Sequence, residues 1–124
     1  MAKRILIVND DPFLLKHVVA NLRARGNKTV MVGEGRTALD IIDQSPPDLV
    51  IMDTKIRDMD SMEMCRKIQE ISEVPIVLLS DNPELADKDN LNSLNLRIED
   101  CIVKPFEIEE LLASVRTVLQ QIKE

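Results

Sequence analysis

The sequence contains two phenylalanines and neither tyrosine nor tryptophan. Its 16 lysines and arginines are outnumbered by 22 aspartates and glutamates, which gives a net charge of −6. Domains that bind nucleic acids usually need basic patches, and many of them stack bases on aromatic rings. The composition therefore argues against direct nucleic-acid binding by this chain.

Glycine, cysteine and histidine are also scarce, and their positions exclude several familiar sites. The three glycines lie between positions 26 and 35, and none follows the first predicted strand. A glycine-rich loop of the mononucleotide or dinucleotide type is therefore absent. Cys65 and Cys101 have no metal or redox spacing, so we expect two reduced, buried thiols. His17 is the single histidine and lies in a helical segment, so a Ser-His-Asp arrangement is not credible.

No hydrophobic stretch has the length of a membrane span or the pattern of a secretory signal. Lys3 and Arg4 lead into a short apolar run that stops at Asn9. No later stretch approaches the ~20 residues of a spanning helix. A chain of 124 residues, 44% of them hydrophobic, fits one compact domain with a real core. We therefore expect residues 1–124 to form a single cytoplasmic domain without membrane contact.

Short apolar runs alternate with segments of helical periodicity along the whole chain. The runs are continuously apolar, which is typical of strands whose two faces are both covered by helices. Five strand–helix units in series predict an α/β fold with a doubly wound parallel sheet and right-handed crossovers. The strands are predicted at Ile5–Val8, Thr29–Val32, Leu49–Met52, Ile76–Leu79 and Ile102–Val103.

Five segments between and after these runs are predicted to be helices. The first is expected to begin with Asp11 as N-cap and Pro12 in its first turn, and to end at Gly26. The fourth is the weakest, because it is polar and has few apolar residues. The later helices are expected over Arg36–Gln44, Met62–Ile71, Pro83–Leu94 and Ile108–Ile122.

Polar residues follow four of the five strands at the point where each strand ends. In a doubly wound sheet the functional site lies beyond the carboxyl ends of the strands, so we expect these residues to converge. The second strand, expected at an edge of the sheet, ends without such a residue. The others are followed by Asn9, Asp10 and Asp11, by Asp53, by Ser80 and Asp81, and by Lys104.

Each of these residues has an ordinary structural explanation when it is considered alone. Asp11 is more simply a helix cap than a ligand. Ser80 alone would be a strand-end hydroxyl, and Lys104 alone a solvated surface lysine. Their coincidence at one end of one sheet favours a functional site.

The chemistry available to this group is restricted. Asp10 and Asp53 supply hard oxygen ligands, which suit Mg²⁺ better than a soft metal. A divalent cation also relieves the repulsion between two close carboxylates. Lys104 offers a compact positive charge to an anion, and Ser80 offers a hydrogen bond. The group predicts a carboxylate nucleophile for phosphoryl transfer, aided by Mg²⁺ and a lysine.

Four segments, taken together, resemble the receiver domain family of two-component response regulators over essentially the whole chain. They are ILIVNDDP at 5–12, PDLVIMD at 47–53, VPIVLLS at 74–80 and VKPF at 103–106. The resemblance implies a flavodoxin-like (βα)5 receiver fold with the strand order 2-1-3-4-5. It also implies a signalling domain that catalyses its own phosphorylation and dephosphorylation but is not a turnover enzyme.

The resemblance also implies a role for individual residues. Asp53 resembles the phospho-acceptor, which receives a phosphoryl group from a histidine kinase or a histidine phosphotransfer protein. Asp10, Asp53 and the backbone carbonyl of Lys55 resemble the Mg²⁺ ligands. Ser80 resembles the hydroxyl that follows the phosphoryl group, and Lys104 resembles the lysine that pairs with it. The peptide between Lys104 and the next proline resembles one that is usually cis in the family.

Several positions depart from the family pattern. Asn9 replaces one carboxylate of the acidic pair, so its metal contact is expected to be weak or mediated by water. Arg57 and Ser61 stand where the loop after the phospho-acceptor commonly has a proline and a glycine. Asp81 replaces a small residue beside the hydroxyl, where its charge would oppose an anionic donor. Cys101 replaces the aromatic residue of the usual switch.

Two functions remain open at this point. The favoured one is a phosphorylated receiver, read by a downstream protein partner or by an output domain that this chain has lost. The other is a degenerate receiver, a phosphorylation-independent protein–protein interaction module, which the departures at the site motivate. A Mg²⁺-dependent phosphatase on a similar sheet is disfavoured, because Lys55 stands where a second acid would be needed.

Overall fold

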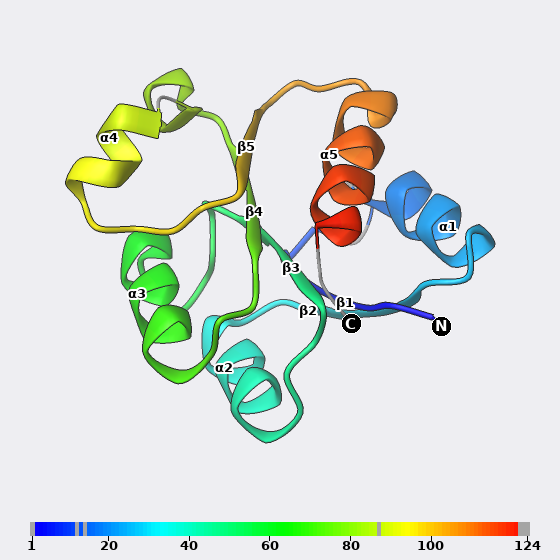
Figure 1. Ribbon diagram of the computed structural model, residues 1–124, viewed down its shortest axis with the longest axis horizontal. Helices are drawn as coiled ribbons and strands as arrows, with labels where there is room; N and C mark the ends of the chain where they lie inside the picture. The colour runs from blue at the N-terminus through cyan, green and yellow to red at the C-terminus, as the bar shows by residue number, and fades with distance from the viewer. Residues whose placement is uncertain (1, 12, 14, 87, 122–124) are drawn as a thin grey trace.

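The computed structural model describes residues 2–11, 13, 15–86 and 88–121. One sheet contains five parallel strands in the order β2-β1-β3-β4-β5, which confirms the predicted fold and strand order (Figure 1). Each strand contains a predicted run and extends it by one or two residues. The strands are β1 (Arg4–Val8), β2 (Lys28–Val32), β3 (Leu49–Asp53), β4 (Ile76–Ser80) and β5 (Asp100–Val103).

Helices cover both faces of the sheet (Figure 1). One face carries α1 (Lys16–Ala24) and α5 (Ile108–Gln120), and the other carries α2 (Gly35–Gln44) and α3 (Ser61–Ile71). The segment between β4 and β5 forms a 3-10 helix, η1 (Pro83–Ala86), and then α4 (Lys88–Ser93). Within the described residues, no helix has the length and apolar character needed to cross a bilayer.

The strand side chains divide between two hydrophobic cores, because successive residues of a strand point to opposite faces. Ile51, Leu79 and Ile102 belong to the core beneath α1 and α5. Met52 and Leu78 belong to the core beneath α2 and α3. The same alternation directs the side chains at the strand ends.

The first helix begins later than predicted. α1 starts at Lys16 with Leu15 at the N-cap, where no side-chain cap is formed. Asp11 instead accepts a hydrogen bond from the backbone N–H of Phe13 at 2.9 Å, a short Asx turn that competes with helix formation. The predicted first-turn proline lies outside the described residues. The helix ends at Ala24 with Arg25 as its C-cap, and Gly26 follows with a φ of 90° that favours glycine, so the predicted glycine stop is confirmed.

The fourth predicted helix, over Pro83–Leu94, corresponds to two short described elements rather than to one described α-helix. η1 has four residues in the 3-10 conformation and α4 has six in the α conformation, and the residue between them lies outside the described residues. Leu91 is buried near the end of the segment, whereas Leu94 is 40% exposed. Short helices are marginal unless tertiary packing stabilises them. The scarcity of apolar residues noted in the sequence agrees with the shortness of both elements.

The two cysteines are both free, but only one is buried as predicted. Cys65 is fully buried in α3, and burial raises the pKa of its thiol to about 12. Cys101 on β5 is half-buried rather than buried, and burial raises its thiol pKa to about 11. Both thiols are therefore neutral at physiological pH, which makes them poor nucleophiles.

Candidate functional site

The register of the sheet brings the predicted site residues together. Val8 of β1 pairs with Met52 of β3, so the residues that follow, Asn9 and Asp53, lie side by side. The strand ends are also joined by backbone hydrogen bonds, including one from Lys104 N to Ser80 O at 2.8 Å. The peptide between Lys104 and Pro105 is cis, as the family resemblance implied.

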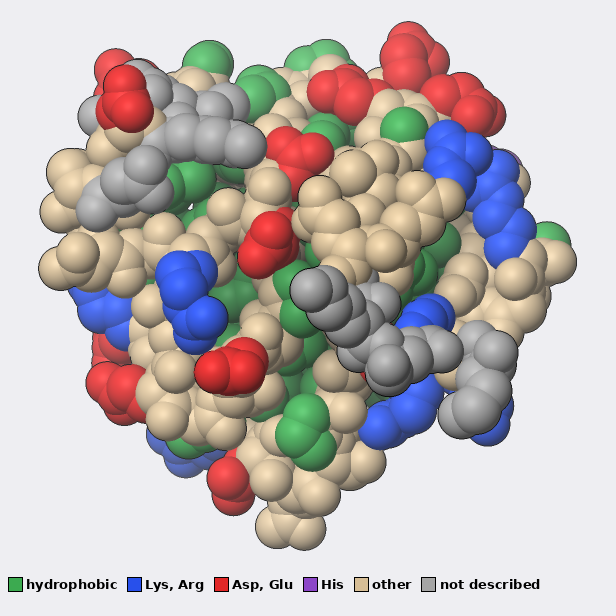
Figure 2. Space-filling model, in the orientation of Figure 1, with side chains coloured by type: hydrophobic (Ala, Val, Ile, Leu, Met, Phe, Trp, Pro, Cys, Tyr) green, Lys and Arg blue, Asp and Glu red, His purple; other side chains and the backbone are tan. Residues whose placement is uncertain are grey.

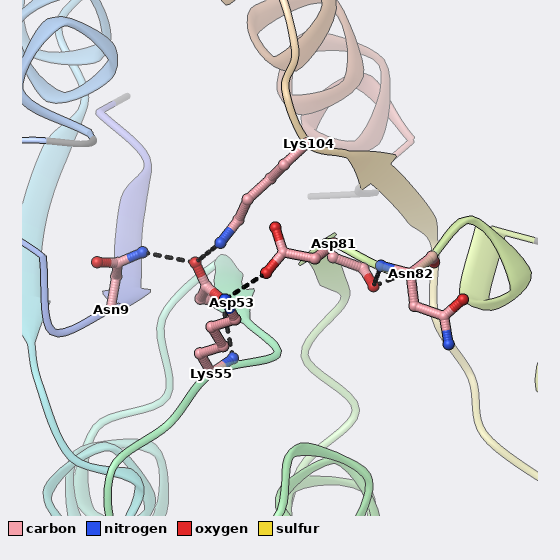
Figure 3. A network of polar contacts seen from close by, with 7 residues as sticks. Asn9, Asp53, Lys55, Asp81, Asn82 and Lys104 are labelled. Atoms are coloured by element: carbon pink, nitrogen blue, oxygen red, sulfur yellow. Dashed lines mark hydrogen bonds and ion pairs between the residues drawn. The ribbon is translucent and has the colours of Figure 1, made fainter.

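Three groups converge on the carboxylate of Asp53 (Figure 3). Asp53 Oδ2 accepts a hydrogen bond from Asn9 Nδ2 at 2.9 Å and forms an ion pair with Lys104 Nζ. Asp53 Oδ1 accepts a hydrogen bond from the backbone N–H of Lys55 at 2.8 Å. The side-chain oxygen of Asn9 accepts the backbone N–H of Asp11, so the amide is fixed with its NH₂ group toward Asp53.

The ion pair lies largely out of water. The side chains of Asp53 and Lys104 are 3% and 14% exposed. Taking two charges out of water costs several kcal/mol for each ion, and the attraction between them offsets this only when further hydrogen bonds are made. Asn9 and the backbone of Lys55 supply those hydrogen bonds. The carboxylate is therefore compensated within the protein and fixed in direction.

The donor set near Asp53 suits a hard divalent cation. A carboxylate offers about four acceptor positions, and the contacts of Asp53 fill three, so that one remains on Oδ1. Asp10 follows Asn9 directly after β1 and has an exposed side chain, and Lys55 lies two residues after Asp53. Among the described residues, no group of three His, Cys, Asp or Glu side chains could hold a metal ion. A metal site here would therefore combine two carboxylates with a backbone oxygen.

Ser80 does not contact Asp53 in this structure. Its hydroxyl donates to Asn82 O at 3.2 Å and accepts from Asn82 N at 2.9 Å. Asn9, Asp53 and Lys104 continue the strand positions of the core beneath α1 and α5. Ser80 instead follows the alternation of Leu78, which belongs to the opposite core. Strand alternation thus explains why the hydroxyl, fully buried at the end of β4, is turned away from the carboxylate.

Lys55 and Asp81 form an ion pair beside Asp53 (Figure 3). Lys55 Nζ lies 2.7 Å from Asp81 Oδ2, and the two side chains are 76% and 47% exposed. Their mutual hydrogen bond raises the pKa of Lys55 and lowers that of Asp81. Exposed pairs of this kind contribute little to stability, because solvent and salt screen the attraction. The pair is therefore easily opened.

Sequence reasoning missed three residues that shape the surrounding loops. Asn82 binds the Ser80 hydroxyl, and Asp58 caps α2 through Gly35 N and Arg36 N. Asp60 caps α3, and Glu63 follows it at the spacing of a capping box, a signal that was readable in the sequence. Asp58 had no such signal, because its partners are more than 20 residues away in the chain.

Comparison with protein families and curated proteins agrees with this geometry. A profile of the response regulator receiver domain matches residues 5–116. The chain is 33% identical over 120 residues to the transcriptional regulatory protein BaeR of Escherichia coli O6:H1. It is 36% identical over 121 residues to the DNA-binding response regulator MtrA of Mycolicibacterium smegmatis. The alignments cover 97% and 98% of this chain but 49% and 52% of those proteins, so it spans about half of their length.

Solved structures show the same architecture. The receiver domain of sensor histidine kinase PA1611 from Pseudomonas aeruginosa PAO1, described with a magnesium ion in its active site cleft, matches with a TM-score of 0.81 and 26% identity. That match covers 98% of this chain and all of the other. A CheY-like receiver domain from Methanospirillum hungatei JF-1 matches with a TM-score of 0.85, 24% identity and coverage of 98% and 96%. This match to the Methanospirillum hungatei domain supports the assignment of the fold.

Substituting Asn9 by aspartate tests how the site balances charge. A carboxylate at this position could not donate a hydrogen bond to Asp53 and would add a negative charge beside it. We expect Asn9→Asp to tighten Mg²⁺ binding several-fold, by about 1 kcal/mol after solvent screening. We also expect it to lower the stability of the metal-free protein. Calorimetric Mg²⁺ titration and urea unfolding with and without Mg²⁺ measure the two effects.

Asn9→Ala is the matched control, because it removes the hydrogen bond without adding a charge. It should lower stability without tightening Mg²⁺ binding. Identical Mg²⁺ titration curves for Asn9→Asp and the parent protein would contradict the electrostatic role of this position.

Proposed function

Since this chain belongs to the response regulator receiver domain family, we propose that its signalling depends on transfer of a phosphoryl group to Asp53. The observation that carries the proposal is the buried Asp53 carboxylate, fixed by Lys104, Asn9 and the backbone of Lys55 at the carboxyl end of a central strand. A carboxylate that is charged and oriented is a competent nucleophile for phosphoryl transfer.

The proposed donor is a phosphohistidine of a histidine kinase or a histidine phosphotransfer protein. An oxygen of Asp53 forms a bond to phosphorus while the phosphorus–nitrogen bond breaks. The imidazole nitrogen leaves with the bonding electrons and takes up a proton from solvent. The ammonium of Lys104 then lies beside both the carboxylate and the anionic phosphoryl group, where its positive charge favours the transfer.

Mg²⁺ is the proposed cofactor, held by Asp10, Asp53 and the backbone carbonyl of Lys55. When bound, it would neutralise charge on the phosphoryl oxygens. The oxygen donor set and the acceptor position left on Asp53 Oδ1 support this assignment. The NH₂ group of Asn9 donates to Asp53, which supports a part for Asn9 in metal binding that is weak or mediated by water.

The proposed readers of the phosphorylated state are a downstream protein or an output domain. The similar BaeR and MtrA proteins are described as regulators of transcription or DNA-binding regulators and are about twice as long as this chain. We propose that residues 1–124 form one receiver domain and that this domain makes no contact with nucleic acid itself. On the face shown in Figure 2, basic side chains lie in several groups separated by acidic and neutral ones. The exchange is proposed to occur in the cytoplasm, where free thiols persist.

Phosphorylation of Asp53 has a direct test. Incubation with acetyl phosphate or phosphoramidate and Mg²⁺ should add the mass of one phosphoryl group, and hydroxylamine should remove it. Asp53→Asn should remain unmodified, because an amide is not a nucleophile of this kind. Intact-protein mass spectrometry is the appropriate readout, since the chain has no tryptophan whose fluorescence could report the change.

Prolonged exposure to donor at millimolar Mg²⁺ without any gain in mass would instead support a phosphorylation-independent interaction module. In that case Asp53→Asn should bind protein partners as the parent protein does.

The Lys55–Asp81 ion pair is proposed to control access of an anionic donor. Asp81 places a negative charge where the donor must approach, and it also occupies the ammonium of Lys55. Because the pair is exposed, its effect acts mainly through electrostatics that salt can screen.

We expect Asp81→Ala to speed phosphorylation by acetyl phosphate several-fold at low salt and less at high salt. Lys55→Ala should slow the reaction, because it removes a positive charge and leaves Asp81 unpaired. If the pair acted as a steric barrier, both substitutions would speed the reaction. Asp40→Ala, which removes a charge on α2, controls for net charge. Rates that are unchanged at every ionic strength would leave Asp81 as an ordinary surface residue.

The signal is proposed to leave the site through the segment between β4 and β5. Cys101 is too small to act as a rotating aromatic switch. Ser80, in contrast, is already bonded to Asn82 at the start of this segment. Within it, η1 and α4 are short helices of four and six residues, the kind of structure that reorganises at low cost.

Hydrogen exchange in the presence of beryllofluoride and Mg²⁺ tests this route. Protection should change across residues 81–97 and around Lys104, and much less in α1 and α2. Changes confined to the loop after Asp53 would show that the partner surface lies elsewhere.

A further inference from the structure

The loop that follows Asp53, residues 54–60, is attached to a distant helix by one carboxylate. Asp58 Oδ1 accepts the backbone N–H of Gly35 at 2.7 Å, and Asp58 Oδ2 accepts that of Arg36 at 3.1 Å. The N-cap residue of α2, Glu34, makes no side-chain cap of its own. Asp58 therefore supplies the cap of α2 from another part of the chain. These backbone hydrogen bonds lower the pKa of the Asp58 carboxyl group.

The residue after Asp58 packs closely against the same turn. Gly35 is buried, and a Cβ atom there would lie 2.9 Å from both Cγ and Sδ of Met59. The side chain of Met59 thus packs so closely on the start of α2 that any side chain at position 35 would require it to move. The packing adds a second contact, independent of the hydrogen bonds of Asp58.

The residue before Asp58 reaches the same turn from the other side. A Cβ at Gly33 would lie 3.3 Å from Arg57 Nη2 and 3.7 Å from both Cα and Cβ of Asp10. The turn between β2 and α2 therefore touches the loop after Asp53 and also the backbone of Asp10. The turn is therefore close to both segments that would supply the proposed Mg²⁺ ligands.

We propose that Asp58 is a positioning residue that holds the loop carrying Lys55 in place for metal binding. A backbone carbonyl is a useful ligand only when its direction is fixed, and a flexible loop must be ordered at an entropic cost before it binds. The family's common loop proline is replaced here by Arg57, so the chain itself is less restricted. The two hydrogen bonds of Asp58 order the loop before the cation arrives. This inference rests on the proposed function of the site.

Asp60 provides a matched comparison within the same loop. It also caps a helix with two hydrogen bonds, which Asp60 Oδ2 accepts from Met62 N and Glu63 N at 3.1 Å. Its partners are its near neighbours in the chain, so it stabilises α3 without attaching the loop to another element. Loss of either cap should reduce stability by a similar amount. Only the loss of Asp58 should alter metal binding.

The experiment compares Asp58→Ala, Asp58→Asn and Asp60→Ala in the whole chain. Mg²⁺ affinity is measured by calorimetry on the unphosphorylated protein, and stability by urea unfolding. We expect Asp58→Ala to weaken Mg²⁺ binding about fivefold, which is the order of effect of a lost helix cap. Asp58→Asn keeps one oxygen acceptor, so its Mg²⁺ affinity should lie between that of the parent protein and that of Asp58→Ala. Asp60→Ala should lose stability and keep the parent Mg²⁺ affinity.

Phosphorylation by acetyl phosphate supplies a second readout. For Asp58→Ala, the Mg²⁺ concentration that gives half the maximal rate should rise, while the rate at saturating Mg²⁺ stays near that of the parent. A general loss of folding would instead lower the rate at saturating Mg²⁺. If Asp58→Ala does not fold, Gly35→Ala tests the same attachment by pressing on Met59. Mg²⁺ affinity should then fall in Gly35→Ala and recover in the double variant with Met59→Ala.

Equal loss of stability in Asp58→Ala and Asp60→Ala, with Mg²⁺ affinity unchanged in both, would show that Asp58 only caps α2. That result would overturn the inference while the proposed function stands. A parent protein that neither binds Mg²⁺ nor gains a phosphoryl group would overturn both.

Discussion

A carboxylate that is 3% exposed, as that of Asp53 is, must be compensated by charges and hydrogen bonds within the protein. Here the compensation comes from the end of β1 through Asn9, from the end of β5 through Lys104, and from the backbone N–H of Lys55. These groups meet because parallel strands end at one edge of the sheet in a fixed register. A slip of one residue in β1 or β5 would turn Asn9 or Lys104 to the opposite face and leave the charge of Asp53 partly uncompensated.

The same register explains what could be predicted from the sequence. Continuous apolar runs marked all five strands, and the residues after them gave the edge at which the site lies. The directions of side chains at that edge were less accessible. Nothing in the sequence indicated that the Ser80 hydroxyl would be bonded to the backbone of Asn82 in this structure. Asp11 carried a helix-start signal, but its side chain closes a local turn and α1 begins five residues later, at Lys16. Local signals fail where two local hydrogen-bonding patterns compete.

Long-range contacts could not be predicted from the sequence, for a different reason. Asp58 caps a helix 22 and 23 residues away, and no spacing rule connects it with Gly35 or Arg36. The glycines gave a partial clue, since Gly35 leaves no room for a side chain against Met59. A glycine at the start of a helix is, however, common enough to have many explanations. Asp58 and Asp60 thus cap helices by the same chemistry, but Asp58 binds a distant segment and Asp60 binds its neighbours. Only the fold reveals this difference.

The position of Ser80 connects the end of β4 with the segment that follows it. Its hydroxyl donates to the backbone carbonyl of Asn82 and accepts from the backbone N–H of the same residue, so its donor is already engaged. Asn82 in turn accepts the backbone N–H of Glu84 in η1. A path of hydrogen bonds therefore joins the Ser80 hydroxyl to the start of η1 through Asn82. The proposed switch uses this path and needs no aromatic residue at position 101, so the small side chain of Cys101 does not conflict with the proposal.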